Sequence, residues 1–276
     1  MLKRIITAVV AVIILLPVLW FSDTFIFPLA IALISCISLF EMFSCLGFKD
    51  KFAVTFPAYL MATAVPFIGK IAGNASTISP AIFAVLILYL SYLMALAVIG
   101  HNKYAMRDLA MCYFISIYII CGFSSVQLLR NMSNNIYLLV FIGAWITDIF
   151  AYFTGFFFGK HKLCETISPK KTIEGSIGGT FFCALAFVAF GAITSKGAIM
   201  AYEYIILAVI GIIISVVSQI GDLSMSLIKR RYGIKDFGKI FPGHGGMLDR
   251  FDSIIAVSSV LFVLLSTLET FNVIIF

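Results

Sequence analysis

The segment KDFGKIFPGHGGMLDRFDS, residues 235–253, places acidic, basic and glycine residues together in an otherwise apolar chain. Carboxylates surrounded by cationic side chains suit a hard divalent cation that also binds substrate phosphates, as magnesium does. The same groups could instead form a salt-bridged helix cap. The charged candidates in and before the segment are Asp222, Lys229, Arg230, Lys235, Asp236, Asp249, Arg250 and Asp252.

The spacing before this segment predicts a helix with a polar face. Asp222 and Ser226 are four residues apart and share a helical face with Lys229. Asp222 lies about 10 Å along the helix from Lys229 at a rise of 1.5 Å per residue. A carboxylate at that depth in an apolar segment is costly unless it is paired or bound to a cation. This cost makes Asp222 a candidate functional residue.

The sequence PGHGG, residues 242–246, predicts a sharp turn because its glycines can adopt positive φ. Such a turn would let the loop fold back and bring Asp249 to Asp222. We expect His244, within the turn, to donate a hydrogen bond to phosphate or to organise the loop.

A second polar segment, GKHKLCETISPKKTIEGSIGG, covers residues 159–179. Its residues Ser168, Lys170, Lys171 and Thr172 look like the start of a helix. A helix N-terminus offers unpaired N–H groups and a positive dipole end, which favour phosphate. Alternatively, the two lysines only anchor a membrane helix among lipid headgroups. The nearby glycines, from Gly175 to Gly179, are expected to permit close helix packing.

The elements that position these segments are membrane helices. Of 276 residues, 62% are hydrophobic and the mean hydropathy is +1.11, whereas soluble domains are roughly 45–50% apolar. A span takes about 20 apolar residues. We expect an all-α polytopic protein, with N-terminal helices in residues 1–130 and a catalytic region in residues 131–276. The nine expected spans are residues 5–21, 25–46, 52–71, 78–100, 108–129, 136–159, 175–194, 204–228 and 253–276.

The basic residues predict the orientation of these spans. Of 19 lysines and arginines, the nine-span division leaves only Lys70, Arg130 and Lys196 on one face. Because cytoplasmic loops carry the excess of basic residues, the N-terminus and both polar segments are expected in the cytoplasm. The net charge of +6 then reflects loops at an anionic membrane surface, and we expect no nucleic-acid partner.

The polar residues resemble the motifs of one enzyme family. SLIKR from Ser226, KD from Lys235, PGHGG and DRFD from Asp249 are similar to the signature of phosphatidate cytidylyltransferases, also called CDP-diacylglycerol synthases. A second match runs from Asp148 through AYFTG, FGKHKL and SPKKTIEG to Gly175. Two positions depart from the family pattern, namely Phe156, where a basic residue is usual, and Ile173, where an aromatic residue is usual.

The resemblance implies an integral membrane enzyme that converts CTP and phosphatidate to CDP-diacylglycerol and pyrophosphate. It implies magnesium, as one ion or two, a homodimer, and a bacterial plasma membrane. Asp222 and Asp249 would hold the metal. Asp148 would bind metal or order a polar cleft that opens to the cytoplasm. Phosphate charge would be offset by Lys229, Arg230, Lys235 and Arg250, within a catalytic motif that includes Asp236, His244 and Asp252. Substrate contacts would come from Ser168, Lys170, Lys171, Thr172 and Ser226.

Two alternative functions remain compatible with a basic, acid-containing polar region. A CTP-dependent lipid-alcohol kinase would need a similar cleft but would transfer the γ-phosphate. An ion-coupled transporter would use Glu41, Asp148 and Asp222 as a pathway, and would require acids through the membrane depth and inverted repeats. The acids here gather toward one face, and we expect Glu41 to pair within the helix bundle.

Overall fold

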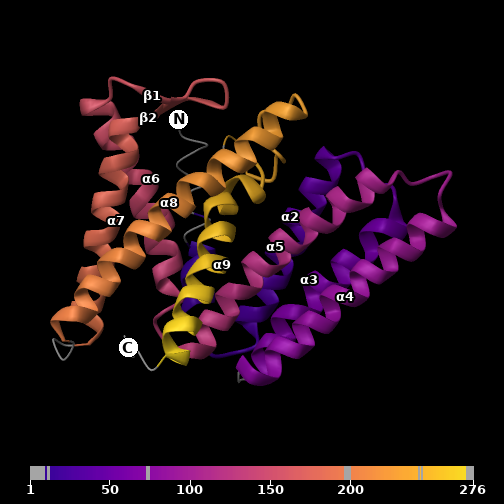
Figure 1. Ribbon diagram of the computed structural model, residues 1–276, viewed down its shortest axis with the longest axis horizontal. Helices are drawn as coiled ribbons and strands as arrows, with labels where there is room; N and C mark the ends of the chain where they lie inside the picture. Colours follow the sequence, from indigo (N-terminus) through magenta and orange to yellow (C-terminus); the bar gives the residue numbers. More distant parts are fainter. Residues whose placement is uncertain are drawn as a thin grey trace. The chain divides into compact units, whose positions relative to one another are not determined.

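The computed structural model describes residues 10, 13–72, 75–195, 200–241, 243 and 245–271. These residues form long helices and one short β-hairpin (Figure 1). The helices are α2 (Ile26–Cys45), α3 (Phe52–Ala72), α4 (Ala75–Ile99), α5 (Met106–Met132), α6 (Leu138–Phe158), α7 (Ile173–Thr194), α8 (Ala201–Arg231) and α9 (Leu248–Thr270). The strands are β1 (Lys162–Cys164) and β2 (Ser168–Thr172).

Eight helices in the described part of the chain are long and apolar enough to cross a membrane. The predicted all-α polytopic membrane fold is therefore confirmed. Of the first expected span, residues 5–21, the structure describes residue 10 and residues 13–21, and residues 13–20 are helical. The ninth was expected from residue 253, but α9 begins at Leu248, so Asp249 and Asp252 both lie on the helix itself.

The chain folds into two compact units that each combine separate stretches of sequence. The first unit contains residues 1–131 and 232–250, and the second contains residues 132–231 and 251–276. In the first unit α3 packs against both α2 and α4, and in the second α7 packs against both α6 and α8. Apolar side chains such as Phe43 in the first unit and Phe187 in the second are fully buried.

Glycines permit the close packing of α6 and α7. A Cβ atom at Gly175 would lie 2.5 Å from the carbonyl oxygen of Ala151, and one at Gly179 would lie 2.7 Å from that of Thr147. Any side chain at either position would therefore push the two helices apart. The predicted packing role of these glycines is confirmed. The β-hairpin connects the two helices that approach each other here.

The segment 168–172 is a strand, so the prediction of a helix start there was wrong. Strand β2 pairs antiparallel with β1, with Lys162 opposite Thr172 and Cys164 opposite Ser168. This pairing satisfies backbone groups that a helix would otherwise have satisfied internally. Helix α7 begins only at Ile173, and the two lysines of β2 therefore precede the first helical turn.

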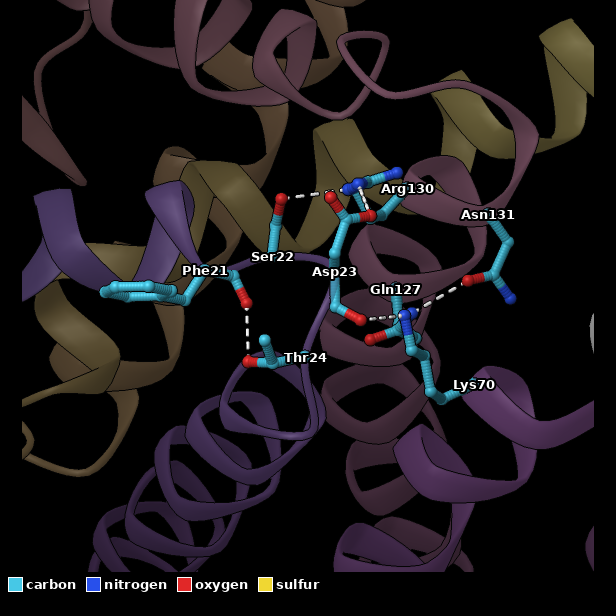
Figure 2. Close-up of polar contacts among 8 residues, drawn as sticks. All are labelled: Phe21, Ser22, Asp23, Thr24, Lys70, Gln127, Arg130 and Asn131. Carbon is cyan, nitrogen blue, oxygen red and sulfur yellow. Dashed lines mark hydrogen bonds and ion pairs between the residues drawn. The ribbon is translucent and has the colours of Figure 1, made fainter.

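A polar cluster fixes the segment before α2 to α3 and α5 (Figure 2). Nε of Arg130 donates to the Ser22 hydroxyl at 2.9 Å, and the guanidinium forms an ion pair with Asp23. Lys70 donates to the backbone carbonyl of Asp23 at 2.7 Å. The Arg130 side chain is only 7% exposed, whereas that of Asp23 is 77% exposed. Arg130 is therefore the partner whose charge needs the ion pair, because water can solvate Asp23 but not the buried guanidinium.

This asymmetry predicts unequal costs for removing the two charges. Asp23→Asn removes a carboxylate charge beside a buried guanidinium and should lower the free energy of unfolding by about 2 kcal/mol. Arg130→Met removes the donor to the Ser22 hydroxyl and leaves no buried charge, since the Asp23 carboxylate is solvated, and should cost about 1 kcal/mol. Thermal unfolding of the detergent-solubilised protein measures both, and a larger loss for Arg130→Met would contradict the assignment.

Candidate active site

An ion pair joins the second polar segment, residues 159–179, to helix α8. Nζ of Lys171, on β2, lies 2.5 Å from Oδ2 of Asp222, on α8. The two side chains are 25% and 26% exposed, respectively, so the pair is largely shielded from water. Asp222, whose carboxylate was predicted to be costly at its depth in the apolar segment, is thus paired with Lys171.

Two further carboxylates lie close to this pair. Asp148 on α6 interacts electrostatically with Lys171 and Asp222, and Asp252 on α9 interacts with Asp222, Lys229 and Asp148. Asp148 is exposed, whereas Asp252 and Lys229 are buried. We call these five residues the carboxylate cluster. Its three acids outnumber its two lysines, so a bound cation would balance the formal charge of the cluster.

A glycine on α8, Gly221, lets the neighbouring Asp222 approach α9. A Cβ atom at Gly221 would lie 2.7 Å from that of Ala256 and 3.3 Å from the backbone oxygen of Asp252. Only glycine fits without displacing one of the helices. The close approach explains why Asp222 and Asp252, on different helices, interact.

The donor atoms of the cluster fit a hard cation. Among the described residues, no three His, Cys, Asp or Glu side chains form a complete metal-binding group. Magnesium does not require one, because it usually binds one or two carboxylates and keeps its other positions for water and substrate phosphates. Carboxylate oxygens beside lysines therefore suit a metal that is shared with a phosphorylated substrate.

The end of α8 contacts the hairpin a second time. Arg230 donates from Nε to the backbone carbonyl of Ile167 at 3.4 Å. Ser226 is half-buried on the same helix as Asp222 and Lys229, as the spacing predicted. The hairpin is thus attached to α8 through a side chain on each element.

Thr172 fixes the base of the hairpin and with it the neighbouring Lys171. Its side-chain oxygen accepts a hydrogen bond from the backbone N–H of Gly175 at 3.1 Å, which caps α7. A Cβ atom at Gly155 or Gly159 would lie within 3 Å of the Thr172 side chain. Thr172 is buried in this glycine-lined gap, so we assign it a positioning role, and its expected phosphate contact stays a prediction.

Glu174 ties the start of the hairpin to α7. Its carboxylate accepts hydrogen bonds from the backbone N–H groups of Lys160 and His161, and lies 2.6 Å from Nδ1 of His161. No motif or spacing predicted this contact, because it depends on backbone groups. Both ends of the segment between α6 and α7 are therefore held by the first turn of α7.

In the first unit, the loop between α8 and α9 closes on Asp249. Oδ2 of this residue accepts hydrogen bonds from the backbone N–H groups of Phe237, at 2.8 Å, and Gly246, at 2.9 Å. The carboxylate is buried. Part of its role is therefore to fold the loop that carries Lys235 and Asp236.

The glycine turn within this loop is confirmed. Phe241 and Gly245 exchange two backbone hydrogen bonds, of 2.9 and 3.1 Å. Gly243 and Gly245 have φ values of 83° and 92°, a region that other residues rarely adopt. A Cβ atom at Gly245 would also lie 2.9 Å from Oδ2 of Asp249. Both the backbone conformation and the lack of space therefore require glycine at this position.

A carboxylate outside every motif also reaches this loop. Glu41 on α2 accepts hydrogen bonds from the backbone N–H groups of Met247 and Leu248. We had expected Glu41 to pair within the helix bundle, and its partners are instead main-chain groups at the start of α9. Sequence spacing could not reveal them, since the contact joins residues more than 200 positions apart.

The remaining predicted residues have the following positions. Lys170, Lys235, Asp236 and Arg250 are exposed, and Ser168 is half-buried. His244 lies outside the described residues. The pairing of Asp222 with Asp249 stays a prediction, because the two residues belong to different units.

The capping role of Thr172 can be tested with a matched threonine. Thr172→Val keeps the side-chain volume but removes the cap, and should lower the free energy of unfolding by about 1 kcal/mol. In the control, Thr194→Val, the lost hydroxyl only bonds backbone of its own helix, so stability should barely change. Thermal unfolding compares them, and equal losses would refute the cap.

The fold and the site together define the class: a polytopic helical membrane protein with a shielded cluster of carboxylates and lysines suited to metal and phosphate chemistry. The cytidylyltransferase family model matches residues 2–268. The chain therefore belongs to the cytidylyltransferase family, and the family resemblance drawn from the motifs is confirmed.

Curated relatives agree with this assignment. The phosphatidate cytidylyltransferase of Staphylococcus haemolyticus is 34% identical over 269 residues, which cover 95% of this chain and 98% of the relative. That of Staphylococcus saprophyticus is 34% identical over 262 residues, with the same coverage. That of Staphylococcus aureus is 40% identical over 175 residues, or 61% of this chain and 63% of the relative.

Proposed function

We propose that the protein is a phosphatidate cytidylyltransferase, which converts CTP and phosphatidate to CDP-diacylglycerol and pyrophosphate. The curated relatives that carry this name align with almost the whole chain. The observation that carries the proposal is the Lys171–Asp222 ion pair. It joins the two motif-bearing segments in one cluster with the charges that a reaction between phosphates requires.

The reaction needs little proton chemistry from the protein. An oxygen of the phosphatidate phosphate attacks the α-phosphorus of CTP, the bond from that phosphorus to the bridging oxygen breaks, and pyrophosphate leaves with the bonding electrons. A phosphate monoester has a second pKa of about 6 and is largely ionised at neutral pH. A general base is therefore not required, and His244 is assigned to hydrogen bonding with phosphate or to loop organisation.

The residues contribute mainly by positioning and by charge. Lys171 and Lys229 supply positive charge beside the carboxylates, and the exposed Arg230, Lys235 and Arg250 are proposed to offset further phosphate charge. Substrate contacts are assigned to Ser168, Lys170, Ser226 and Thr172, with Asp236 and Asp252 completing the catalytic motif.

Magnesium, as one ion or two, is proposed as the cofactor. Asp222 and Asp249 would hold it, and Asp148 and Asp252 interact with Asp222 and so strengthen the negative potential at that carboxylate. Bound magnesium would neutralise charge on the phosphates of both substrates.

We also propose that the cluster faces the cytoplasm of a bacterial cell, in the plasma membrane, and that the enzyme is a homodimer. The excess of lysine and arginine in the loops on one face supports the orientation. The dimer is inferred from the family resemblance. A cytoplasmic cleft lets soluble CTP meet a lipid headgroup whose acyl chains stay in the bilayer.

The reaction can be tested with CTP labelled at the α- or the γ-phosphate. Wild-type protein in phosphatidate-containing micelles with magnesium should place α-label in lipid and release pyrophosphate. Asp222→Asn and Asp249→Asn should each lower the rate by about 100-fold or more, because they remove charge at the reacting phosphates. Asp108→Asn is the control, since Asp108 forms only an exposed ion pair, 3.9 Å from Lys51. Transfer of γ-label to lipid would indicate a kinase, and no transfer would favour a transporter.

The adjacent lysines of β2 provide a matched comparison. Lys171 is paired with Asp222, whereas Lys170 is exposed. Lys171→Met should lower the rate of transfer by about 30-fold, because it removes the countercharge that is paired with the partly shielded Asp222. Lys170→Met should lower it by no more than about fivefold, as for a solvated charge. Equal effects in the same assay would mean that the ion pair does not organise the site.

A further inference from the structure

The carboxylate of Glu41 caps the helix that carries two of the motif acids. Its Oε1 accepts a hydrogen bond from the N–H of Met247 at 2.9 Å, and its Oε2 accepts one from the N–H of Leu248 at 2.8 Å. Helix α9 begins at Leu248. A residue of α2 therefore supplies two acceptors that the first turn of α9 cannot supply itself.

The surroundings of Glu41 are shaped to receive it. The residue is 3% exposed, and a Cβ atom at Gly238 or at Gly246 would overlap its carboxylate. Glycine at positions 238 and 246 therefore leaves the space that the Glu41 carboxylate occupies. A negative charge at the positive end of the α9 dipole adds to the two hydrogen bonds.

Glu41 and Asp249 act on the same loop from opposite ends of the chain. Asp249 accepts from Phe237 and Gly246, and Glu41 accepts from the next two N–H groups, those of Met247 and Leu248. Two buried carboxylates therefore satisfy four backbone donors that frame the loop. All of these residues belong to the first unit.

We propose that Glu41 is a positioning residue for the transfer reaction, which holds the loop at residues 235–246 and the start of α9 in their working geometry. It acts through Asp249 and the loop and has no assigned contact with substrate. The proposal rests on the proposed function, because the loop carries the predicted phosphate and metal groups. A misplacement of about 1 Å in such a site can cost roughly 100-fold in rate.

The test compares two buried glutamates that cap helices. Glu41→Gln keeps the shape of the side chain but removes its charge and turns one acceptor into a donor that faces an N–H. Glu203→Gln is the matched control, because Oε2 of Glu203 accepts from the N–H of Met200 at 2.6 Å, at the start of α8. Glu203 is also buried, but lies about 28 Å along α8 from Asp222.

Two measurements are made on each full-length variant. Hydrogen exchange of residues 235–248 should become about tenfold faster in Glu41→Gln, as expected for a lost hydrogen bond to a charged acceptor, and should be unchanged in Glu203→Gln. In the α-label assay, Glu41→Gln should lower kcat by about 100-fold with little change in the KM for CTP. Glu41→Asp, which keeps the charge on a shorter side chain, should recover part of the lost kcat.

The outcomes separate this proposal from the proposed function. Unchanged exchange in Glu41→Gln would overturn the proposal, as would faster exchange with normal kcat. An equal loss of kcat in Glu203→Gln would assign the effect to general destabilisation and would also overturn it. A wild-type protein that transfers no α-label would refute the proposed function alone, and the exchange comparison would still decide whether Glu41 holds the loop.

Discussion

A carboxylate within an apolar helix needs a partner, and this requirement governs the arrangement of the second unit. Asp222 meets it through Lys171, a residue that can reach it only if the hairpin stands against the end of α8. The hairpin in turn is held by Thr172 in its gap between glycines and by Arg230. The electrostatic cost of one buried charge is thus met by contacts from three elements. These contacts also bring the residues of the carboxylate cluster together.

The chain uses side-chain oxygens to complete helix starts. Thr172 acts at α7, Glu203 acts at α8, and Glu41 acts at α9. Each satisfies N–H groups next to or within a first turn, where they have no partner in the helix. In a membrane protein such groups are costly when shielded from water, so oxygen acceptors at these ends stabilise both the helix and the loop that enters it.

The sequence predicted the features that have a local signature. Apolar stretches identified the helices, the glycines of residues 242–246 predicted the turn, and Gly175 and Gly179 predicted close helix packing. Features that depend on main-chain partners outside the element itself were missed. The strand at residues 168–172 and the early start of α9 are of this kind, since each depends on a pairing or a cap supplied by another segment. Lys171 and Asp222 were both chosen as candidates, but no spacing in the sequence indicates that they are partners.

The two units are interleaved along the chain, and this order has a consequence for biosynthesis. The loop at residues 232–250 belongs with helices that the ribosome completes about a hundred residues earlier. During synthesis the carboxylate of Glu41 therefore enters the membrane on α2 long before its partners Met247 and Leu248 exist. It must remain hydrated or protonated while the following helices are inserted. The first 131 residues are consequently not a self-sufficient module, and the first unit can complete its fold only after the chain has been synthesised as far as residue 250.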